Sequence, residues 1–282
     1  MNSRMQSFER DTLMSVVNSK RVWLLHVIAN ALLMVAFFYW TRIPEENGLQ
    51  FSLTVASGLL IVFVTLWLHS ATFDYFYPAG ERGLIENGMI EKRIIQSLRR
   101  SAARVPAFLV WALIFGLGLW LIRELWSYDA QTGGWVRHSL PGVLRREVTP
   151  RSTISAASWL GWFLYFFFWP ILFLPVGGQV AIKNFRGFFS SSAFRPLREI
   201  RFWILYFVCF IAGAYVPYKI VWMTPIRPSP LNQQTWSMAI RLGAAYLLIV
   251  TAWLVLCAAI MRASDGDAAP ASEPEPVAVT PM

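Results

Sequence analysis

The sequence predicts an all-α, polytopic membrane protein with six transmembrane helices in three helical hairpins, plus cytoplasmic amphipathic interfacial helices. Three observations support this fold class. The 282 residues are 56% hydrophobic and only 15% charged, whereas charged residues make up about a quarter of a typical soluble domain. The apolar residues form six runs that approach or exceed the roughly 18 to 20 residues needed to cross a bilayer. Several of the 14 tryptophans lie near the ends of these runs, where indole rings prefer the headgroup level.

The six runs define a transmembrane domain at residues 22–262. Each run is expected to be a helix, because an open sheet cannot satisfy its backbone hydrogen bonds in lipid. Residues 1–21 are expected to form a cytoplasmic N-terminal interfacial helix, and residues 263–282 an acidic, proline-rich, disordered C-terminal tail. The predicted spans are residues 22–40, 51–68, 107–126, 157–174, 202–223 and 238–261.

A basic amphipathic helix is predicted at residues 89–105, directly before the third span. On a helix, one face of this segment is apolar and the remaining faces are basic. The apolar stripe suits the acyl boundary of a membrane, while the basic side chains suit anionic lipid headgroups or a docking partner. The apolar face consists of Ile90, Ile94, Leu98, Ala102 and Val105, and the candidate docking residues are Lys92, Arg93, Arg99, Arg100 and Arg104.

Similar junctions introduce the first, third and fifth spans. In each, an arginine is followed by an apolar residue and then by tryptophan or proline, at Arg21, Arg104 and Arg201. This spacing indicates three hairpins, each preceded by a basic segment. The recurrence of this junction has two possible explanations. One is internal duplication, and the other is the general tendency of spans that run outward from the cytoplasm to follow an arginine.

The distribution of basic residues predicts the orientation. Most of the 25 lysines and arginines lie on the side of the N-terminus, so the positive-inside rule places both termini in the cytoplasm and the protein in a bacterial inner membrane. The connection at residues 127–156, with Arg137, Arg145, Arg146 and Arg151, opposes this orientation without reversing it. The net charge of +9 therefore indicates anionic lipid as a partner, and no recognition motif for nucleic acid accompanies it.

The fourth span is the most irregular, because it contains Pro170 and is followed by Pro175, Gly177 and Gly178. Proline removes a backbone hydrogen bond, which predicts a helix kink, and interrupted helices can also line a binding cavity. In the first span, Asn30 is the one strongly polar residue predicted at depth, and we expect it to be a buried polar group that hydrogen-bonds between helices.

Two histidines form the sharpest candidate constellation. His26 in the first span and His69 after the second fall near the same side of the membrane, so they are expected to approach each other. Two facing imidazoles can ligate haem b, which makes a bis-histidine membrane cytochrome an alternative function. Asp74 beside His69 suggests a metal site but offers too few ligands, and His138 lies on the other side.

No catalytic set accompanies these residues, so the sequence predicts a protein that is not an enzyme and needs no cofactor. The chain has no phosphate-binding loop, metalloprotease motif or nucleophile elbow. Cys209 and Cys257 lie within spans and are expected to be free thiols that act as small apolar residues.

The layout of an N-terminal interfacial helix, six spans and a basic helix between spans 2 and 3 resembles that of the membrane subunits of ABC-2-type exporters. The resemblance implies a permease-like subunit that docks a cytoplasmic ATPase through residues 89–105, or that works with another membrane subunit. The short, proline-rich connection at residues 224–234 departs from the larger structure that those subunits carry before their last span. The predicted function is transport or membrane organisation, and a homo-oligomer is compatible with this prediction.

Overall fold

The computed structural model describes residues 2–44, 46–77, 90–222 and 231–264, with side chains described from residues 8, 94 and 232 onward in the first, third and last of these segments. The described residues form helices joined by short turns, and no strand occurs among them. Six of the described helices are long and apolar enough to cross a membrane. The prediction of an all-α, polytopic membrane protein is therefore confirmed, and the chain is a multi-pass membrane protein.

The first hairpin pairs α2 (Lys20–Trp40) with α3 (Gly48–Phe76) and follows the N-terminal helix α1 (Asn2–Asn18). Asn47 caps the start of α3, because its side chain accepts a hydrogen bond from the Gln50 backbone N–H. Helix α3 extends eight residues beyond the predicted span, whose end was placed at residue 68.

The second hairpin pairs α6 (Val105–Ser127) with a long helical segment made of α9 (Pro150–Phe163), the π-helix η1 (Leu164–Phe168) and α10 (Trp169–Lys183). Helix α5 (Ile90–Ala102) precedes it. The connection between α6 and α9 is itself helical, and consists of α7 (Asp129–Ser139) and α8 (Gly142–Glu147). Because α7 packs along α9, this hairpin is longer than the two spans predicted for it.

The third hairpin pairs α11 (Ile200–Phe210), the π-helix η5 (Ile211–Tyr215) and α12 (Val216–Val221) with the long α13 (Leu231–Ser264). Between the second and third hairpins lie three short 3₁₀-helices, η2 (Asn184–Phe189), η3 (Ser191–Phe194) and η4 (Pro196–Arg198). All but two residues of the predicted C-terminal tail, and most of the connection at residues 224–234, lie outside the described residues.

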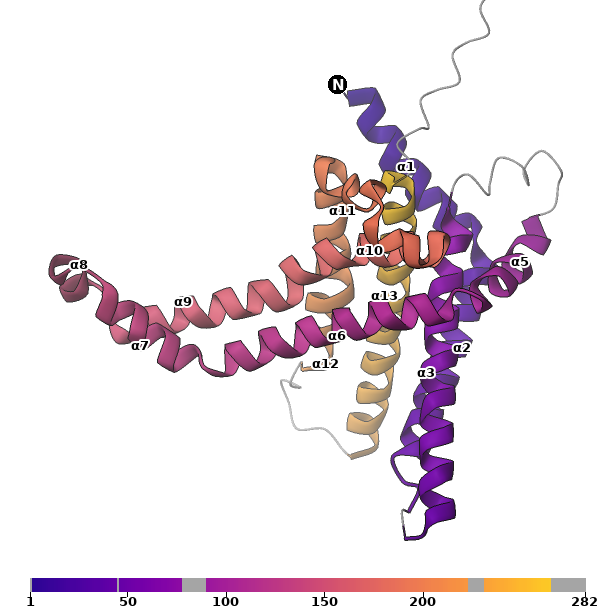
Figure 1. Ribbon diagram of the computed structural model, residues 1–282, viewed down its shortest axis with the longest axis horizontal. Coiled ribbons are helices and arrows are strands. Elements are labelled where there is room, and N and C mark those ends of the chain that lie inside the picture. The colour runs from indigo at the N-terminus through magenta and orange to yellow at the C-terminus, as the bar shows by residue number, and fades with distance from the viewer. Residues whose placement is uncertain (1, 45, 78–89, 223–230, 265–282) are drawn as a thin grey trace, which may run out of the picture.

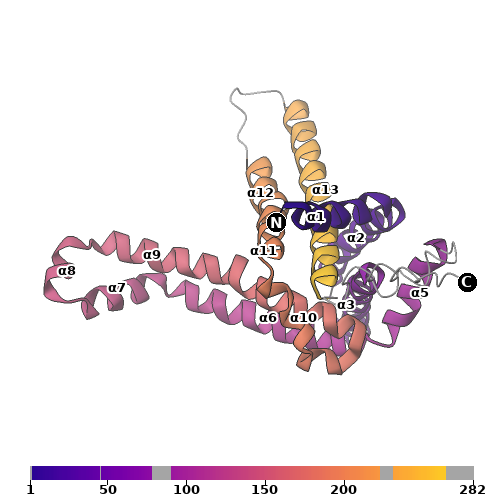
Figure 2. The ribbon, with the colours of Figure 1, turned by 90° about the horizontal axis from the view of Figure 1, so that it is seen from above.

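The three hairpins meet at one end of the molecule and diverge from it (Figures 1 and 2). We call this end the apex. It contains α1, the N-terminal ends of α2, α6 and α11, and the C-terminal ends of α3, α10 and α13. The α6–α9 hairpin leaves the apex in a different direction from the other two, and the α7–α8 connection lies at its far tip.

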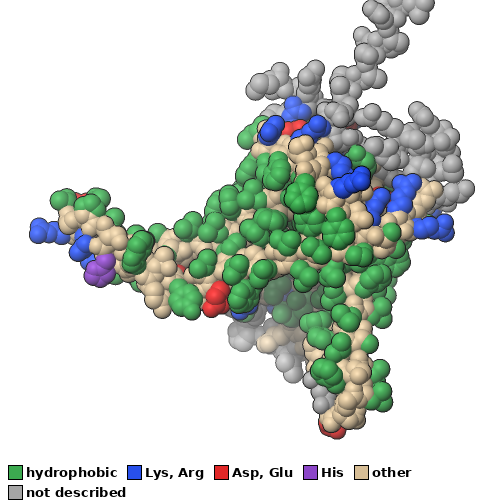
Figure 3. Space-filling view, in the orientation of Figure 1, with side chains coloured by type: hydrophobic (Ala, Val, Ile, Leu, Met, Phe, Trp, Pro, Cys, Tyr) green, Lys and Arg blue, Asp and Glu red, His purple; other side chains and the backbone are tan. Residues whose placement is uncertain are grey.

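The hydrophobic core occupies the apex, and α13 is the most buried of the six spans. Phe73, Phe108, Ile171, Phe202 and Ile260 are each nearly fully buried there. Away from the apex, the hairpins expose large apolar side chains, as the green surface in Figure 3 shows. Such exposure is unfavourable in water but not in hydrocarbon, so these surfaces are those of lipid-facing helices.

Two π-helical segments each precede a proline by two residues. The segment η1 ends at Phe168, before Pro170, and η5 ends at Tyr215, before Pro217. A proline ring clashes with the carbonyl four residues earlier, and the wider π turn moves that carbonyl away. The irregularity predicted in the fourth span is therefore present at Pro170, whereas Pro175 is accommodated within α10.

Candidate functional site

The structure brings His26 of α2 and His69 of α3 together near the apex. Their ring centroids lie 5.7 Å apart, at an interplanar angle of 41°. This follows from the antiparallel pairing of the two helices, which places the start of α2 beside the end of α3. The side chains that surround the pair decide what the histidines can do.

Both ring nitrogens of His26 are hydrogen-bonded. Its Nε2 lies 2.6 Å from the Thr72 hydroxyl, and its Nδ1 lies 3.3 Å from the Asn30 side-chain nitrogen. Because the Thr72 hydroxyl donates to the Leu68 carbonyl, it accepts from Nε2, and this assigns Nδ1 as the acceptor for Asn30. Asn30 therefore bonds within its own helix, and the link between helices that was expected of it is made by His26.

His69 has a different environment. Its ring packs edge-on against Trp253 of α13, with centroids 5.2 Å apart. His69 Nδ1 and Trp253 Nε1 are both buried and have no hydrogen-bond partner within the part of the chain that the structure describes. Trp253 also packs against Phe73, which joins α3 to the core helix α13.

These residues do not fit a haem. A bis-histidine haem needs one free imidazole nitrogen on each side of the iron, but both nitrogens of His26 are engaged by Thr72 and Asn30. The cavity beside His26 has a volume of about 10 Å³, which is room for roughly one water molecule. The arrangement supports a structural hydrogen-bond network between α2 and α3.

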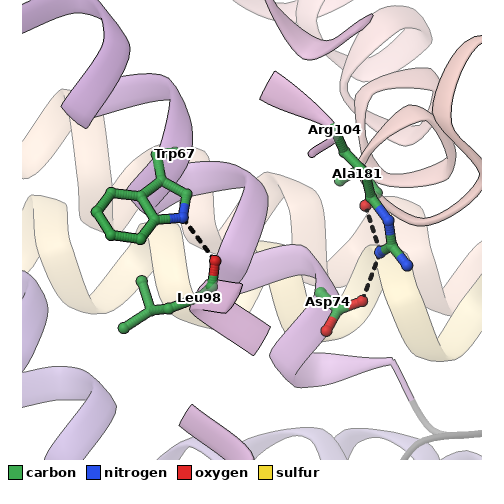
Figure 4. A network of polar contacts seen from close by, with 5 residues as sticks. All are labelled: Trp67, Asp74, Leu98, Arg104 and Ala181. Atoms are coloured by element: carbon green, nitrogen blue, oxygen red, sulfur yellow. Dashed lines mark hydrogen bonds and ion pairs between the residues drawn. The ribbon is translucent and has the colours of Figure 1, made fainter. Parts of the chain in front are cut away.

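Asp74 forms an ion pair with Arg104, with 2.6 Å between its Oδ1 and the arginine Nη1 (Figure 4). The same nitrogen donates to the Ala181 carbonyl at 2.9 Å, so one guanidinium joins the end of α3, the start of α6 and α10. Near this contact, Trp67 of α3 donates to the Leu98 carbonyl and holds α5 against α3. Within the described residues, no three histidine, cysteine or carboxylate side chains come together as a metal site.

The predicted docking residues are divided between different environments. Arg99 and Arg100 are exposed on α5, while Arg104 follows α5 and is directed towards Asp74. The side chains of Lys92 and Arg93 lie outside the described residues. Figure 3 shows further basic side chains over the apex, so this end presents positive charge.

Gly177 and Gly178 serve helix packing. A Cβ atom on Gly177 would lie 2.6 Å from the Trp111 ring, and one on Gly178 would lie 3.0 Å from the Met261 sulfur. These glycines let α10 approach α6 and α13 closely. Pro175 is also buried among these helices.

An apolar groove with a volume of about 930 Å³ lies between the first and third hairpins. We call it the interhairpin groove. The polar side chains in its lining are mainly those of Asn30, Thr65 and His69. The Tyr246 hydroxyl of α13 donates a hydrogen bond to the Val27 carbonyl of α2 at 2.5 Å, which connects the third hairpin to the first. The remaining walls include Met34, Phe37, Ile61, Ala214, Leu242, Ala245, Ile249 and Trp253. Of the residues that line this groove, the sequence singled out only Asn30 and His69, because its walls come from different hairpins that meet only in the tertiary structure.

Comparisons of the chain with protein-family models, with curated proteins and with solved structures found no match.

Proposed function

We propose that this multi-pass protein is a non-enzymatic component of a bacterial inner membrane, of the transport or membrane-organisation class, which holds the hydrocarbon chain of an amphiphile in its interhairpin groove. The observation that carries the proposal is the groove itself. It opens between two membrane-spanning hairpins and is lined almost entirely by apolar side chains. Its volume of about 930 Å³ lies within the range of pockets that hold small molecules.

The occupant follows from the surroundings of the groove. Water is excluded from the hydrocarbon region, so an open apolar groove there is filled by hydrocarbon. Asn30 and His69 supply polar contacts, which suits an amphiphile with a hydrogen-bonding group more than a pure alkane.

The polar groups near the apex support a non-enzymatic role. His26 is engaged on both nitrogens, and Asp74 is bound by Arg104. These contacts stabilise helix packing and leave neither group free for proton transfer to a substrate.

A cytoplasmic partner such as an ATPase, as the layout of ABC-2-type exporters implies, would meet the exposed Arg99 and Arg100 of α5. The helix lies at the apex with α1 and the end of α13, and the positive charge there supports a cytoplasmic location for this end and for both termini. The bis-histidine cytochrome receives no support from the geometry of His26 and His69.

Photolabelling tests the proposal. The full-length protein is reconstituted in lipid nanodiscs that contain a phospholipid with a diazirine on its acyl chain, and the labelled residues are mapped by mass spectrometry. We expect labels concentrated on groove residues. The substitutions Leu242→Trp and Ile249→Trp, which fill the groove from its half-exposed wall, should reduce this labelling several-fold.

Ile240→Trp is the matched control, because Ile240 is exposed on α13 and is not part of the groove lining. It should leave the labelling unchanged. Equal labelling of the groove and of the outer helix faces, or no response to Leu242→Trp and Ile249→Trp, would overturn the proposal.

A further inference from the structure

A cluster of four polar side chains lies at the end of α10. We call it the Lys183 cluster, and it consists of Lys183, Ser190, Ser192 and Gln179. The Lys183 Nζ donates to the Ser190 and Ser192 hydroxyls at 2.8 and 2.9 Å, and these two oxygens lie 2.6 Å apart. The Ser192 hydroxyl donates to Gln179 Oε1 at 2.7 Å, and Gln179 is only 1% exposed. The cluster is thus anchored on a buried side chain.

The local backbone builds this cluster. After Lys183, Asn184 adopts φ 57°, a left-handed conformation that costs a non-glycine residue about 1–3 kcal/mol. The chain then turns back along α10, and a Cβ on Gly187 would lie 2.4 Å from the Val180 backbone nitrogen. This close approach returns Ser190 to the side of Lys183.

The cluster contains no acidic side chain among the residues that the structure describes. In the segments that the structure describes, Lys183 contacts two neutral hydroxyls and forms no ion pair. Two of its three ammonium hydrogens reach Ser190 and Ser192, so the third is available to a ligand. Since Ser192 gives its hydrogen to Gln179, Ser190 is the donor in its 2.6 Å contact with Ser192. The Ser190 hydroxyl can donate to a ligand instead by turning away from Ser192. An ammonium beside a hydroxyl donor suits the oxygens of a phosphate group.

Exposed aromatic residues are close to the cluster in the sequence. Phe185, Phe189 and Phe194 are 52%, 94% and 49% exposed, and Arg186 on the same segment is also exposed. Three exposed phenylalanines on a basic segment are costly in water, but they suit the boundary between lipid headgroups and acyl chains. The segment also lies at the apex, where η3 packs against α13.

We propose that the Lys183 cluster binds the phosphate of an anionic phospholipid headgroup, with the neighbouring phenylalanines inserted at the acyl boundary. This site is separate from the interhairpin groove, because none of its four residues lines that groove. It would hold the short 3₁₀-helices, and with them the junction of the second and third hairpins, at a fixed depth on the membrane surface.

A serine–lysine hydrolase is the competing interpretation of the same residues. A lysine acts as a general base when burial removes its ammonium from water, but Lys183 is exposed and lies in the last turn of α10. The negative end of the helix dipole stabilises a cation at that position. The cluster is therefore suited to binding an anion.

Native mass spectrometry of the full-length protein in mild detergent tests the proposal. The protein is titrated with phosphatidylglycerol and, separately, with diacylglycerol of the same acyl chains, and inorganic phosphate is added as a competitor. We expect tighter binding of phosphatidylglycerol. Lys183→Gln and the double variant Ser190→Ala/Ser192→Ala should weaken that binding roughly tenfold, which corresponds to about 1.4 kcal/mol.

Ser191→Ala is the matched control, because Ser191 is an exposed neighbour outside the cluster, and it should bind as the unmodified protein does. Thermal unfolding of each variant reports whether it is folded. Unchanged phosphatidylglycerol binding by folded Lys183→Gln, or equal binding of diacylglycerol, would overturn the proposal. Displacement by inorganic phosphate at concentrations equal to those of the lipid would overturn the lipid assignment. Photolabelling of the groove in Lys183→Gln should be unchanged, so the two proposals fail separately.

Discussion

At the scale of single residues, the Asp74–Arg104 ion pair connects the first hairpin to the second. The side chains of Asp74 and Arg104 are 7% and 23% exposed, so the pair is largely removed from solvent. Through Arg104 it joins three helices, since the guanidinium also meets the Ala181 carbonyl. Removing one partner leaves a desolvated charge without compensation, which costs more than the pair contributes when intact.

We therefore predict that Asp74→Asn and Arg104→Gln each lower the free energy of unfolding by about 1–3 kcal/mol. The double variant should lose less than the sum of the two single variants, because the second substitution removes a charge that the first had left unpaired. Thermal unfolding of the purified protein in detergent measures this coupling. Arg100→Gln, at an exposed position nearby, should change stability little, and additive losses in the double variant would contradict the prediction.

Only part of the histidine network could be predicted from sequence. The proximity of His26 and His69 follows from their positions on paired antiparallel helices. Their partners do not follow in the same way. Thr72 is one turn from His69 on α3 and is an ordinary threonine in the sequence, whereas Trp253 lies on the last span. Which face of α3 turns towards α2 depends on helix packing. The hydrogen-bond partner of each imidazole nitrogen could therefore be known only from the structure.

At the scale of helices, the second hairpin is joined by indole rings packed over glycines of the opposite helix. Trp169 lies over Gly118 and donates to the Phe115 carbonyl at 3.0 Å, and Trp111 lies over Gly177 and donates to the Phe173 carbonyl at 3.0 Å. In lipid, where apolar contact alone gives little selectivity, close packing and hydrogen bonds between helices decide which helices pair.

This arrangement predicts that Gly118→Ala and Gly177→Ala destabilise the hairpin by about 1–3 kcal/mol, because an added methyl group overpacks the interface. A Cβ on Gly118 would lie 1.9 Å from the Trp169 ring. Gly116→Ala is the matched control on the same helix, since a Cβ there meets nothing within 4 Å. Thermal unfolding compares the three variants, and equal stability of Gly118→Ala and Gly116→Ala would disprove this account of the packing.

The sequence shows which prolines lie within the predicted spans. It does not show how the helix backbone around each proline changes. Pro170 and Pro217 each follow a π-helical segment, while Pro175 stays within a buried helix. A proline removes the same hydrogen bond at every position. The neighbouring helices determine whether the backbone widens or remains regular.

At the scale of the whole molecule, the three hairpins share a basic apex and separate towards their far ends. The orientation that we propose from the positive-inside rule has the apex in the cytoplasm and the α8 tip on the other side. The two native cysteines are buried, so an introduced cysteine can report on topology with little background.

We predict that Val143→Cys in α8 reacts with a membrane-impermeant maleimide added to intact cells. Ile95→Cys in α5 should react only after permeabilisation. Both positions are exposed, at 76% and 64%, so a difference in reactivity reports the side of the membrane and not burial. Labelling of Ile95→Cys in intact cells would reverse the proposed orientation.

By itself the sequence determined that the chain is a six-span, all-helical membrane protein, because hydrocarbon admits long apolar segments only when their backbone hydrogen bonds are satisfied internally. It also determined that His26 and His69 lie near one end. Only the tertiary structure decided that the hairpins diverge, that a groove opens between the first and third, and that Lys183 meets two serines. The physical reason is that lipid is as apolar as the helices themselves, so composition specifies insertion but not pairing. Pairing depends on indole–glycine contacts, the Asp74–Arg104 ion pair and local turns, whose partners are distant in sequence.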